Sequence, residues 1–322
     1  MKLVSQLVAS TLLFALAAGS SFAQSYPAKP VRMIVPFPPG GGVDVVARTF
    51  SQKFTEAWGQ QVIVENRPGA GGNIGADAVA KAAPDGYTLL ITTTGHAVAP
   101  SLYRKLPFDS INDFSAASQI TSTYLVLVAN PGMPATLKDL VALAKSQPGK
   151  LNYGHTGLGV APHMVGEMLK VAAGIDIVMV TYKGDAQTVP AMLSNEVQMG
   201  FSPPTTVVQH VKTGRLRALA VSGAARGAAF PDVPTVTEAG YPDATYNGWV
   251  GFFVPAGTPR DILNKISSET ARALRLHDVA ERLPGWGAEA AGTTPEEFAA
   301  RYRADIARYA RIIKDANIPR LD

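Results

Sequence analysis

Short runs of β-forming residues alternate with helical stretches along this chain, and that order limits the possible folds more than any other feature. The first three runs lie at residues 31–35, 61–65 and 88–92, and the stretch at 44–57 carries apolar residues at helical spacing. Strands that are separated by helices pair in parallel. The sequence therefore predicts a parallel sheet with helices on both faces.

The same alternation starts again in the middle of the chain. Further strands are predicted at residues 124–129, 151–153, 177–182, 197–201 and 216–221. A last strand at 251–254 is followed by two helices, which begin near Thr258 and Thr294 with capping residues. These two helices have no further sheet to cover, so we expect them to pack on the first unit.

This packing requires the chain to cross twice between the units, near residues 120–125 and 245–250. Two crossings form a hinge and leave a cleft between the units. We therefore predict an α/β fold of two domains with two chain crossovers. Domain 1 is expected to hold residues 24–122 and 248–322, and domain 2 residues 123–247.

The N-terminal end predicts a secretory signal peptide at residues 1–23. Lys2 supplies a positive charge, an apolar run follows at residues 7–18, and small side chains precede a cleavage site near Ala23-Gln24. The apolar run is too short to span a membrane. A buried N-terminal helix is the alternative interpretation. Fold reasoning therefore starts at Gln24.

The composition narrows the class of protein further. Apolar residues make up 47% of the chain and charged residues only 17%, which suits large buried cores and excludes a disordered protein. The chain has no cysteine, so thiol chemistry and disulfides are excluded. The formal net charge is +4, which suits an anionic ligand, but no dense Lys/Arg run indicates a nucleic-acid partner.

Ligands of open α/β sheets bind beyond the carboxyl ends of the strands. Three glycines follow the first strand and begin the first helix, so bare backbone N–H groups and the positive end of the helix can receive an anion there. A second glycine-containing loop, at residues 154–163, begins a helix of the second unit. Two such helix starts on opposing units could hold the two ends of a dicarboxylate.

Residues around these strand ends are the predicted ligand-binding residues. Asp44 can cap the first helix or contact the ligand, Phe37 can stack on it or join the core, and Lys183 can pair with a carboxylate of the ligand or of its own domain. The full predicted set is Phe37, Gly40, Gly41, Gly42, Asp44, Thr93, Thr94, His96, Thr156, Gly157, Gly159, Val160, Ala161, His163, Lys183 and Ser202.

Several signatures of enzymes are absent from the sequence. The chain has no Walker loop, no G-x-S-x-G turn and no H-E-x-x-H helix, and the glycines at 69–75 do not have dinucleotide-binding spacing. His163 and Glu167 lie one helical turn apart but lack a third metal ligand. We therefore predict no catalytic residue, no metal and no cofactor, and we expect a protein that is not an enzyme. A secreted α/β enzyme that uses the same cleft is the alternative.

A set of longer motifs occurs in order along the chain, at residues 26–30, 36–44, 64–75, 84–90, 148–153, 182–184, 214–220 and 230–235. With these motifs the chain resembles the Bug-type substrate-binding proteins of tripartite tricarboxylate transporters. The resemblance implies a monomeric periplasmic receptor with the Venus flytrap form of the periplasmic-binding-protein fold. Such a receptor captures a carboxylate by domain closure, largely through backbone groups and bridging water, and delivers it to membrane components of the transporter.

Two departures from the family pattern bear on the ligand. Val160-Ala161-Pro162 stands where many relatives have hydroxyl residues, and Ser202-Pro203-Pro204 where many have an aspartate. The second domain should therefore be less polar than usual, so we expect a ligand with an apolar or aromatic body rather than one like citrate. A receptor that reports its ligand to a membrane signalling protein is an alternative, because it would use the same closure.

Overall fold

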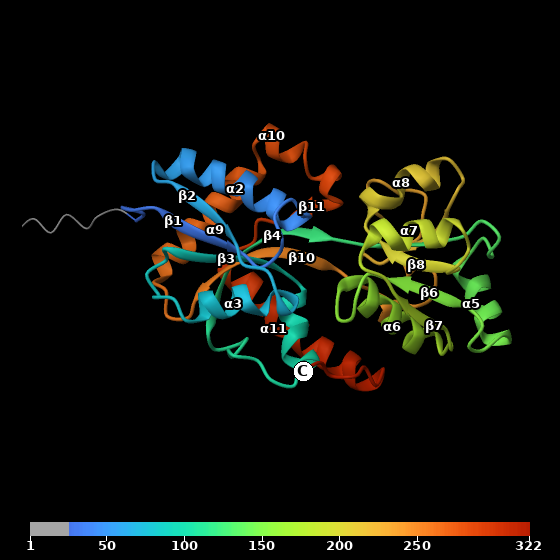
Figure 1. The fold of residues 1–322 in the computed structure, drawn as a ribbon. Helices are drawn as coiled ribbons and strands as arrows, with labels where there is room; N and C mark the ends of the chain where they lie inside the picture. Colours follow the sequence, from blue (N-terminus) through green and yellow to red (C-terminus); the bar gives the residue numbers. More distant parts are fainter. Residues whose placement is uncertain (1–25) are drawn as a thin grey trace, which may run out of the picture.

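The computed structural model of the protein describes residues 26–322, so the predicted signal peptide lies outside the described residues. Figure 1 shows two lobes side by side, each built around its own β-sheet. Among residues 26–322, no helix combines the length and the apolar character that crossing a bilayer requires.

The first lobe contains a six-stranded sheet in the order β11-β4-β10-β3-β1-β2. Its strands are β1 (Val31–Val35), β2 (Val62–Asn66), β3 (Thr88–Thr93), β4 (Phe114–Thr123), β10 (Gly248–Pro255) and β11 (Ala288–Ala290). As predicted, β1 pairs in parallel with β2 and β3. The strands β4 and β10, which lead to and from the other lobe, pair antiparallel with each other.

Helices cover both faces of this sheet, and its strands are therefore buried on both sides. Met33 and Val35 point to one face, where they pack with α2 (Gly42–Trp58) and α9 (Arg260–Leu274). Ile34 points to the other face, in a cluster to which five helices contribute. Three of them belong to the first lobe: α3 (Asn73–Ala80), α4 (Gly95–Leu102) and α11 (Pro295–Asp315). The other two belong to the second lobe: α5 (Leu137–Ser146) and α6 (Ala161–Ala173). The predicted packing of the C-terminal helices on the first unit is confirmed.

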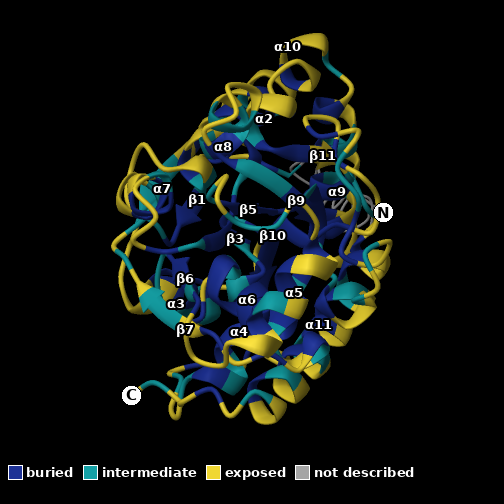
Figure 2. Ribbon diagram, turned by 90° about the vertical axis from the view of Figure 1, so that its right-hand side faces the viewer, coloured by how far each residue is buried: buried dark blue, intermediate teal, exposed yellow. Residues whose placement is uncertain are grey.

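Short elements complete the first lobe. They are the 3₁₀ turns η1 (Ala70–Gly72) and η3 (Pro284–Trp286) and the helix α10 (His277–Ala280). Figure 2 shows that buried residues follow the strands and the inner sides of the helices, while the outer sides of α5 and α11 are exposed.

The second lobe contains a five-stranded sheet in the order β7-β6-β8-β5-β9. Its strands are β5 (Val126–Ala129), β6 (Asn152–His155), β7 (Val178–Thr181), β8 (Met199–Ser202) and β9 (Arg217–Val221). Its other helical elements are α5 (Leu137–Ser146), α7 (Asp185–Leu193), α8 (Pro204–Lys212) and the 3₁₀ turn η2 (Pro242–Ala244). The strand β6 pairs in parallel with β7 and β8, and β5 is antiparallel to β8 and β9.

The two crossings between the lobes lie next to each other and share hydrogen bonds. Thr123 at the end of β4 is paired with Gly248 at the start of β10. Ser222 joins both crossings, because its hydroxyl accepts from the N–H of Leu125 at 2.9 Å and donates to the carbonyl of Tyr246 at 3.0 Å. The chain changes sheets between β4 and β5 and again before β10, which confirms a fold with two crossovers. The exact domain boundaries stay a prediction.

The return crossing is also held by α11 of the first lobe. Arg301 donates to the carbonyl of Asn247 at 2.6 Å, and the indole N–H of Trp249 donates to Asp305 at 2.9 Å. Because these bonds attach the return crossing to the first lobe, residues 247–249 should move with that lobe when the lobes rotate.

Candidate functional site

The loop between β1 and α2 presents unpaired backbone N–H groups. The helix α2 begins after Gly41, which has extended backbone angles and no side chain to cap the helix. The N–H groups of the first helical residues have no partner within the helix. A Cβ atom built on Gly42 would meet no atom within 4 Å, so this helix start faces open space. The loop has the backbone groups and the room that an anion needs.

Asp44 fixes the conformation of this loop through the hydrogen bonds of its side chain. Its carboxylate is 2% exposed and accepts hydrogen bonds from the N–H of Gly40 at 2.9 Å, from Asn66 at 2.8 Å and from Arg48 at 2.9 Å. Burial raises its pKa, but the hydrogen bonds from Arg48, Gly40 and Asn66 outweigh burial and hold the pKa below its usual value. Both oxygens are occupied by protein donors, so the structure supports a loop-positioning role and not a ligand contact.

We expect Asp44→Ala to lower the free energy of unfolding by about 2–3 kcal/mol, because it leaves buried donors without an acceptor. The depressed pKa means that this stabilisation is complete above the pKa of about 3.9 in the unfolded chain and is lost as the pH falls through the lower folded value. Urea denaturation over a pH series measures both effects. The control is Asp77→Ala, which removes a pair with Lys81 within α3. Equal losses in the two variants would contradict the assignment.

Three of the predicted ligand-binding residues lie at the end of β3: Thr93, Thr94 and His96. The last two are buried. Thr93 is half-buried, but the hydroxyl of Thr94 is buried and accepts from the N–H of Trp249 at 2.8 Å. His96 is 5% exposed, and its ring is surrounded by four other aromatic rings with centroids 4.7–5.8 Å away. Burial lowers its pKa to about 3. In this structure Thr94 bonds to the crossing and His96 packs in the core. Their contact with the ligand stays a prediction.

The second-lobe loop, residues 156–160, joins β6 to α6 and presents apolar side chains. Leu158 is 49% exposed and Val160 is 42% exposed, whereas Thr156, Gly157 and Ala161 are half-buried. The helix α6 has no side-chain cap at Val160. This lobe therefore offers an uncapped helix start with apolar side chains beside it.

Two loops of the second lobe contact the first lobe outside the crossings. Gly159 of the second-lobe loop packs against Leu102 at the end of α4, so closely that a Cβ on Gly159 would lie 2.0 Å from Cδ2 of Leu102. A Cβ on Gly287, which follows η3, would lie 3.1 Å from Pro204 at the start of α8. The loops that follow β6 and β8 therefore both lie against the first lobe. A ligand that contacts both lobes at once needs such an arrangement.

The other predicted residues occupy varied environments. Phe37 is half-buried and packs on the core beside α2. Lys183 is exposed, and within residues 26–322 no ion pair involves it, so the expected salt bridge in its own domain does not form. The hydroxyl of Ser202 is fully buried and has no hydrogen-bond partner among the described residues.

Sequence reasoning did not select two residues that lie at the same edge. Asp185 begins α7, and within residues 26–322 one of its buried carboxylate oxygens has no hydrogen-bond partner. Burial raises its pKa. His155 ends β6 and is buried beneath the second-lobe loop. Nothing in their spacing distinguishes them from ordinary polar residues at a strand end or a helix start.

The pair His163 and Glu167 does not extend to a metal site. Nε2 of His163 lies 4.0 Å from Oε1 of Glu167. In the part of the chain that the structure describes, no group of three or more His, Asp or Glu side chains is placed to hold a metal ion.

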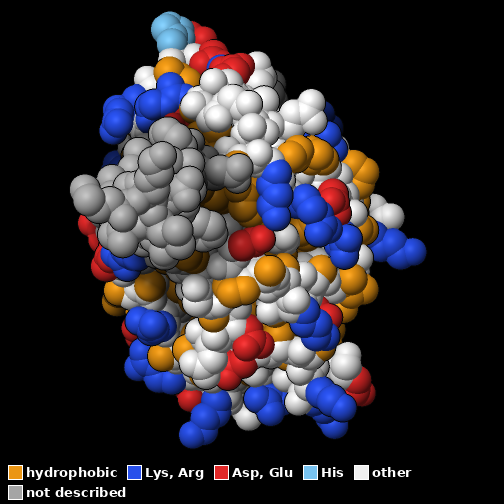
Figure 3. Space-filling view, turned by 90° about the vertical axis from the view of Figure 1, so that its left-hand side faces the viewer, with side chains coloured by type: hydrophobic (Ala, Val, Ile, Leu, Met, Phe, Trp, Pro, Cys, Tyr) orange, Lys and Arg blue, Asp and Glu red, His pale blue; other side chains and the backbone are white. Residues whose placement is uncertain are grey.

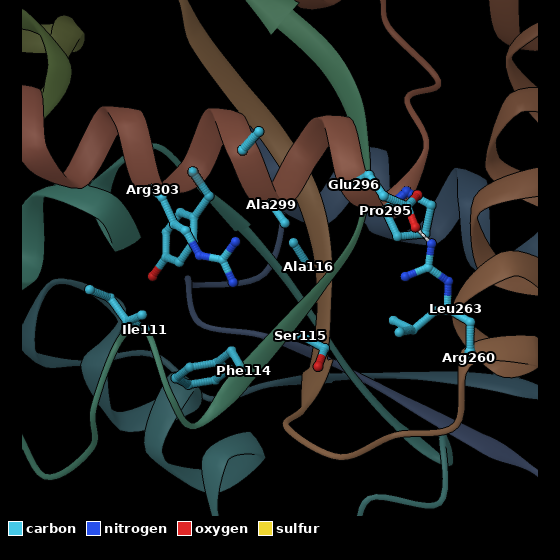
Figure 4. A pocket seen from close by; sticks show the side chains of 12 residues that line it. Ile111, Phe114, Ser115, Ala116, Arg260, Leu263, Pro295, Glu296, Ala299 and Arg303 are labelled. Atoms are coloured by element: carbon cyan, nitrogen blue, oxygen red, sulfur yellow. Dashed lines mark ion pairs between the residues drawn. The ribbon is translucent and has the colours of Figure 1, made fainter.

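A separate cavity of about 340 Å³ lies in the first lobe, between β4, α9 and α11 (Figure 4). Phe114 and Tyr302 line it, and Arg303 reaches over it from α11. Arg260 and Glu296 form an ion pair at its edge. None of the predicted ligand-binding residues lines this cavity.

Comparison with known proteins places the chain in a family. The sequence model of the tripartite tricarboxylate transporter family receptor matches residues 46–318. The protein BugT of Bordetella pertussis is 36% identical over 296 residues, which cover 91% of each chain. A protein encoded between tcbD and tcbE in Pseudomonas sp. strain P51 is 36% identical over 295 residues, which cover 90% of this chain and 87% of that protein.

Solved structures agree with this placement. The periplasmic binding protein BugD has a TM-score of 0.76 and 31% identity, covering 92% of this chain and all of that one. An R. palustris protein solved with adipate has a TM-score of 0.79 and 31% identity over the same shares. MatC of Rhodopseudomonas palustris, solved with malate, has a TM-score of 0.75 and 30% identity, covering 89% and 100%. The chain therefore belongs to the receptor family of the tripartite tricarboxylate transporters and has the two-lobed fold of a periplasmic solute-binding protein.

Proposed function

We propose that this protein captures a small organic anion by closing its lobes and delivers it to the membrane components of a tripartite tricarboxylate transporter. The observation that carries the proposal is the uncapped start of α2, where backbone N–H groups face open space at the end of the helix that points towards the second lobe (Figure 1). Two relatives of the same fold were solved with adipate and malate, which are carboxylates. An anion at a helix start gains from both the N–H groups and the helix dipole.

The ligand's carboxylate is proposed to bind at the N–H groups of residues 41–44, with the hydroxyl of Thr93 nearby. Its body is proposed to lie against Leu158 and Val160 of the second-lobe loop, whose exposed apolar side chains support an apolar or aromatic ligand. The unpartnered hydroxyl of Ser202 can meet a polar group of the ligand or a bridging water. Lys183 can reach a second carboxylate at the edge of the cleft.

Further features of the proposal follow from the family. The protein is expected to be exported to the periplasm by residues 1–23, to act as a monomer, and to perform no chemistry on its ligand. On the face in Figure 3, basic side chains are interspersed with acidic and apolar ones, which supports the expectation of no nucleic-acid partner.

Calorimetric titration against a panel of acids tests the proposed function. The panel contains adipate, malate, citrate, benzoate and octanoate, and the protein is first unfolded and refolded to remove any bound ligand. We expect acids with an apolar body to bind with micromolar or lower Kd, and citrate at least about tenfold more weakly. Tight citrate binding without affinity for benzoate or octanoate would contradict the apolar site. Product formation from any of these acids would contradict the receptor assignment.

A further inference from the structure

Two buried histidines support the second-lobe loop from beneath. His163 lies in the first turn of α6, and its Nδ1 is 3.3 Å from the backbone nitrogen of Gly159. A backbone N–H can only donate, so Nδ1 of His163 must accept and cannot carry a proton. The imidazole of His163 is therefore neutral in this arrangement, with its proton on Nε2.

His155 makes similar contacts with the other glycine of the loop. Its Nδ1 lies 3.0 Å from the carbonyl oxygen and 3.3 Å from the backbone nitrogen of Gly157, and its Nε2 lies 3.1 Å from the hydroxyl of Thr181. The rings of His155 and His163 are 4.7 Å apart between centroids. Both glycines have backbone angles in the left-handed region, so the loop conformation depends on these supports.

The surroundings of His163 oppose a positive charge on it more than they favour one. On its own helix, Glu167 lies 4.0 Å from Nε2 but is already paired with Lys170 at 3.3 Å. The other titratable neighbours are His155, from β6, and Tyr153, whose hydroxyl donates to the carbonyl of Pro162 at 2.6 Å. The positive end of α6 adds to this opposition. Leu102, which faces the loop from the first lobe, carries no charge.

We propose that His163 is a positioning residue of the receptor site: its neutral ring holds Gly159 against Leu102 of the first lobe, and its protonation releases the loop. This inference rests on the proposed function, because the contact between Gly159 and Leu102 joins the lobes around the cleft. A protonated Nδ1 would turn a hydrogen bond into two N–H groups facing each other. The loop would then move away and the closed form would lose a contact.

The sign of the pH effect follows from the direction of the shift. Burial first, and then His155 and Lys170, lower the pKa of His163 to about 4. A group with a lowered pKa of this kind keeps its contribution above the unfolded value of about 6.5 and loses it as the pH falls towards the folded value. We therefore expect the loop contact to weaken between these two values.

Two substitutions at His163 separate the effect of its hydrogen-bond acceptor, Nδ1, from the effect of the rest of the ring. In His163→Asn the amide oxygen can take the place of Nδ1 and cannot be protonated, whereas His163→Leu has no acceptor. His277→Asn is the matched control, because His277 is exposed at the start of α10, beside Glu281. Urea denaturation of each variant shows whether it is folded before binding is measured.

Adipate binding and hydrogen exchange of the 156–160 peptide are measured from about pH 7.5 to about pH 4.5. Because adipate itself titrates there, each variant is compared with the wild type at equal pH. We expect His163→Asn to bind within about threefold of the wild type at the higher pH and to lose less affinity on acidification, and His163→Leu to bind at least about tenfold more weakly throughout. Exchange of the peptide should speed up on acidification in the wild type but not in His163→Asn, once the intrinsic rate is corrected.

The proposal is overturned if the Asn and Leu variants behave alike, or if the Asn variant keeps the pH profile of the wild type. Hydrogen exchange needs no ligand. If the wild type does not bind adipate, the exchange result therefore still decides the role of His163, while the titration bears on the proposed function alone.

Discussion

Replacing Gly41 by aspartate is expected to abolish ligand binding while leaving the protein at least as stable as the wild type. Gly41 is the residue before α2, with φ −75° and ψ 167°, angles that any residue adopts. A Cβ there would lie 3.5 Å from the carbonyl oxygen of Pro38, which is ordinary contact. Aspartate at this position accepts hydrogen bonds from the first N–H groups of the helix. The side chain would therefore occupy the groups that we assign to the ligand's carboxylate.

The expected effects on binding and on stability have opposite signs. Loss of two hydrogen bonds to a charged ligand costs about 3–6 kcal/mol, so affinity should fall by at least about 100-fold. Capping in place of glycine changes the free energy of unfolding by only a few tenths of a kcal/mol, in the stabilising direction. Calorimetry measures the affinity and urea denaturation the stability.

Two further substitutions at Gly41 separate the effect of capping the helix from the effects of added charge and added side-chain volume. Gly41→Asn caps the helix without adding charge, so its binding should fall between that of the wild type and the aspartate variant. Gly41→Ala leaves the N–H groups free and should bind within about threefold of the wild type. If the aspartate variant bound as well as the alanine variant, the carboxylate would not lie at the start of α2.

Elements with a clear apolar pattern could be read from the sequence. The strand β1 is almost wholly apolar, and α2 repeats its apolar residues at helical spacing, so both were predicted within two residues of their ends. The ten-residue strand β4 was missed, because serine, threonine and alanine dominate it and no apolar alternation marks it. One of its buried hydroxyls has a partner far along the chain, because Ser118 donates to the carbonyl of Thr293 at 2.8 Å. Such partners lie far along the chain and leave no local signal.

The candidate site likewise has parts that the sequence could predict and parts that it could not. Glycines between a strand and a helix indicate exposed backbone wherever they occur, so the loop at Gly40–Gly42 could be predicted locally. The direction of His96 could not, because the rings of Phe253 and Tyr302 that enclose it come from distant elements. The supporting role of His155 likewise depends on Gly157 and Thr181 meeting the two sides of its ring. The local sequence predicts where backbone N–H groups are exposed, whereas the direction of a side chain depends on the assembled fold.

Ser222→Ala is expected to lower the free energy of unfolding by about 2–4 kcal/mol, because Ser222 joins the two crossings between the lobes. Its hydroxyl accepts from the Leu125 N–H and donates to the carbonyl of Tyr246, and all three residues are buried. Alanine would leave the Leu125 N–H facing a methyl group, with the full cost of an unpaired buried donor. For a chain of this size, the expected loss lowers Tm by roughly 3–6 °C.

Ser267→Ala is the matched control for this loss. Ser267 is also a buried serine, and it donates to the carbonyl of Thr293 at 3.0 Å within the first lobe. That carbonyl keeps a second donor in Ser118, so no buried group is left unpaired and the loss should stay near about 1 kcal/mol. Urea denaturation of both variants measures the difference. If Ser222→Ala cost no more than Ser267→Ala, the hydroxyl would not couple the crossings.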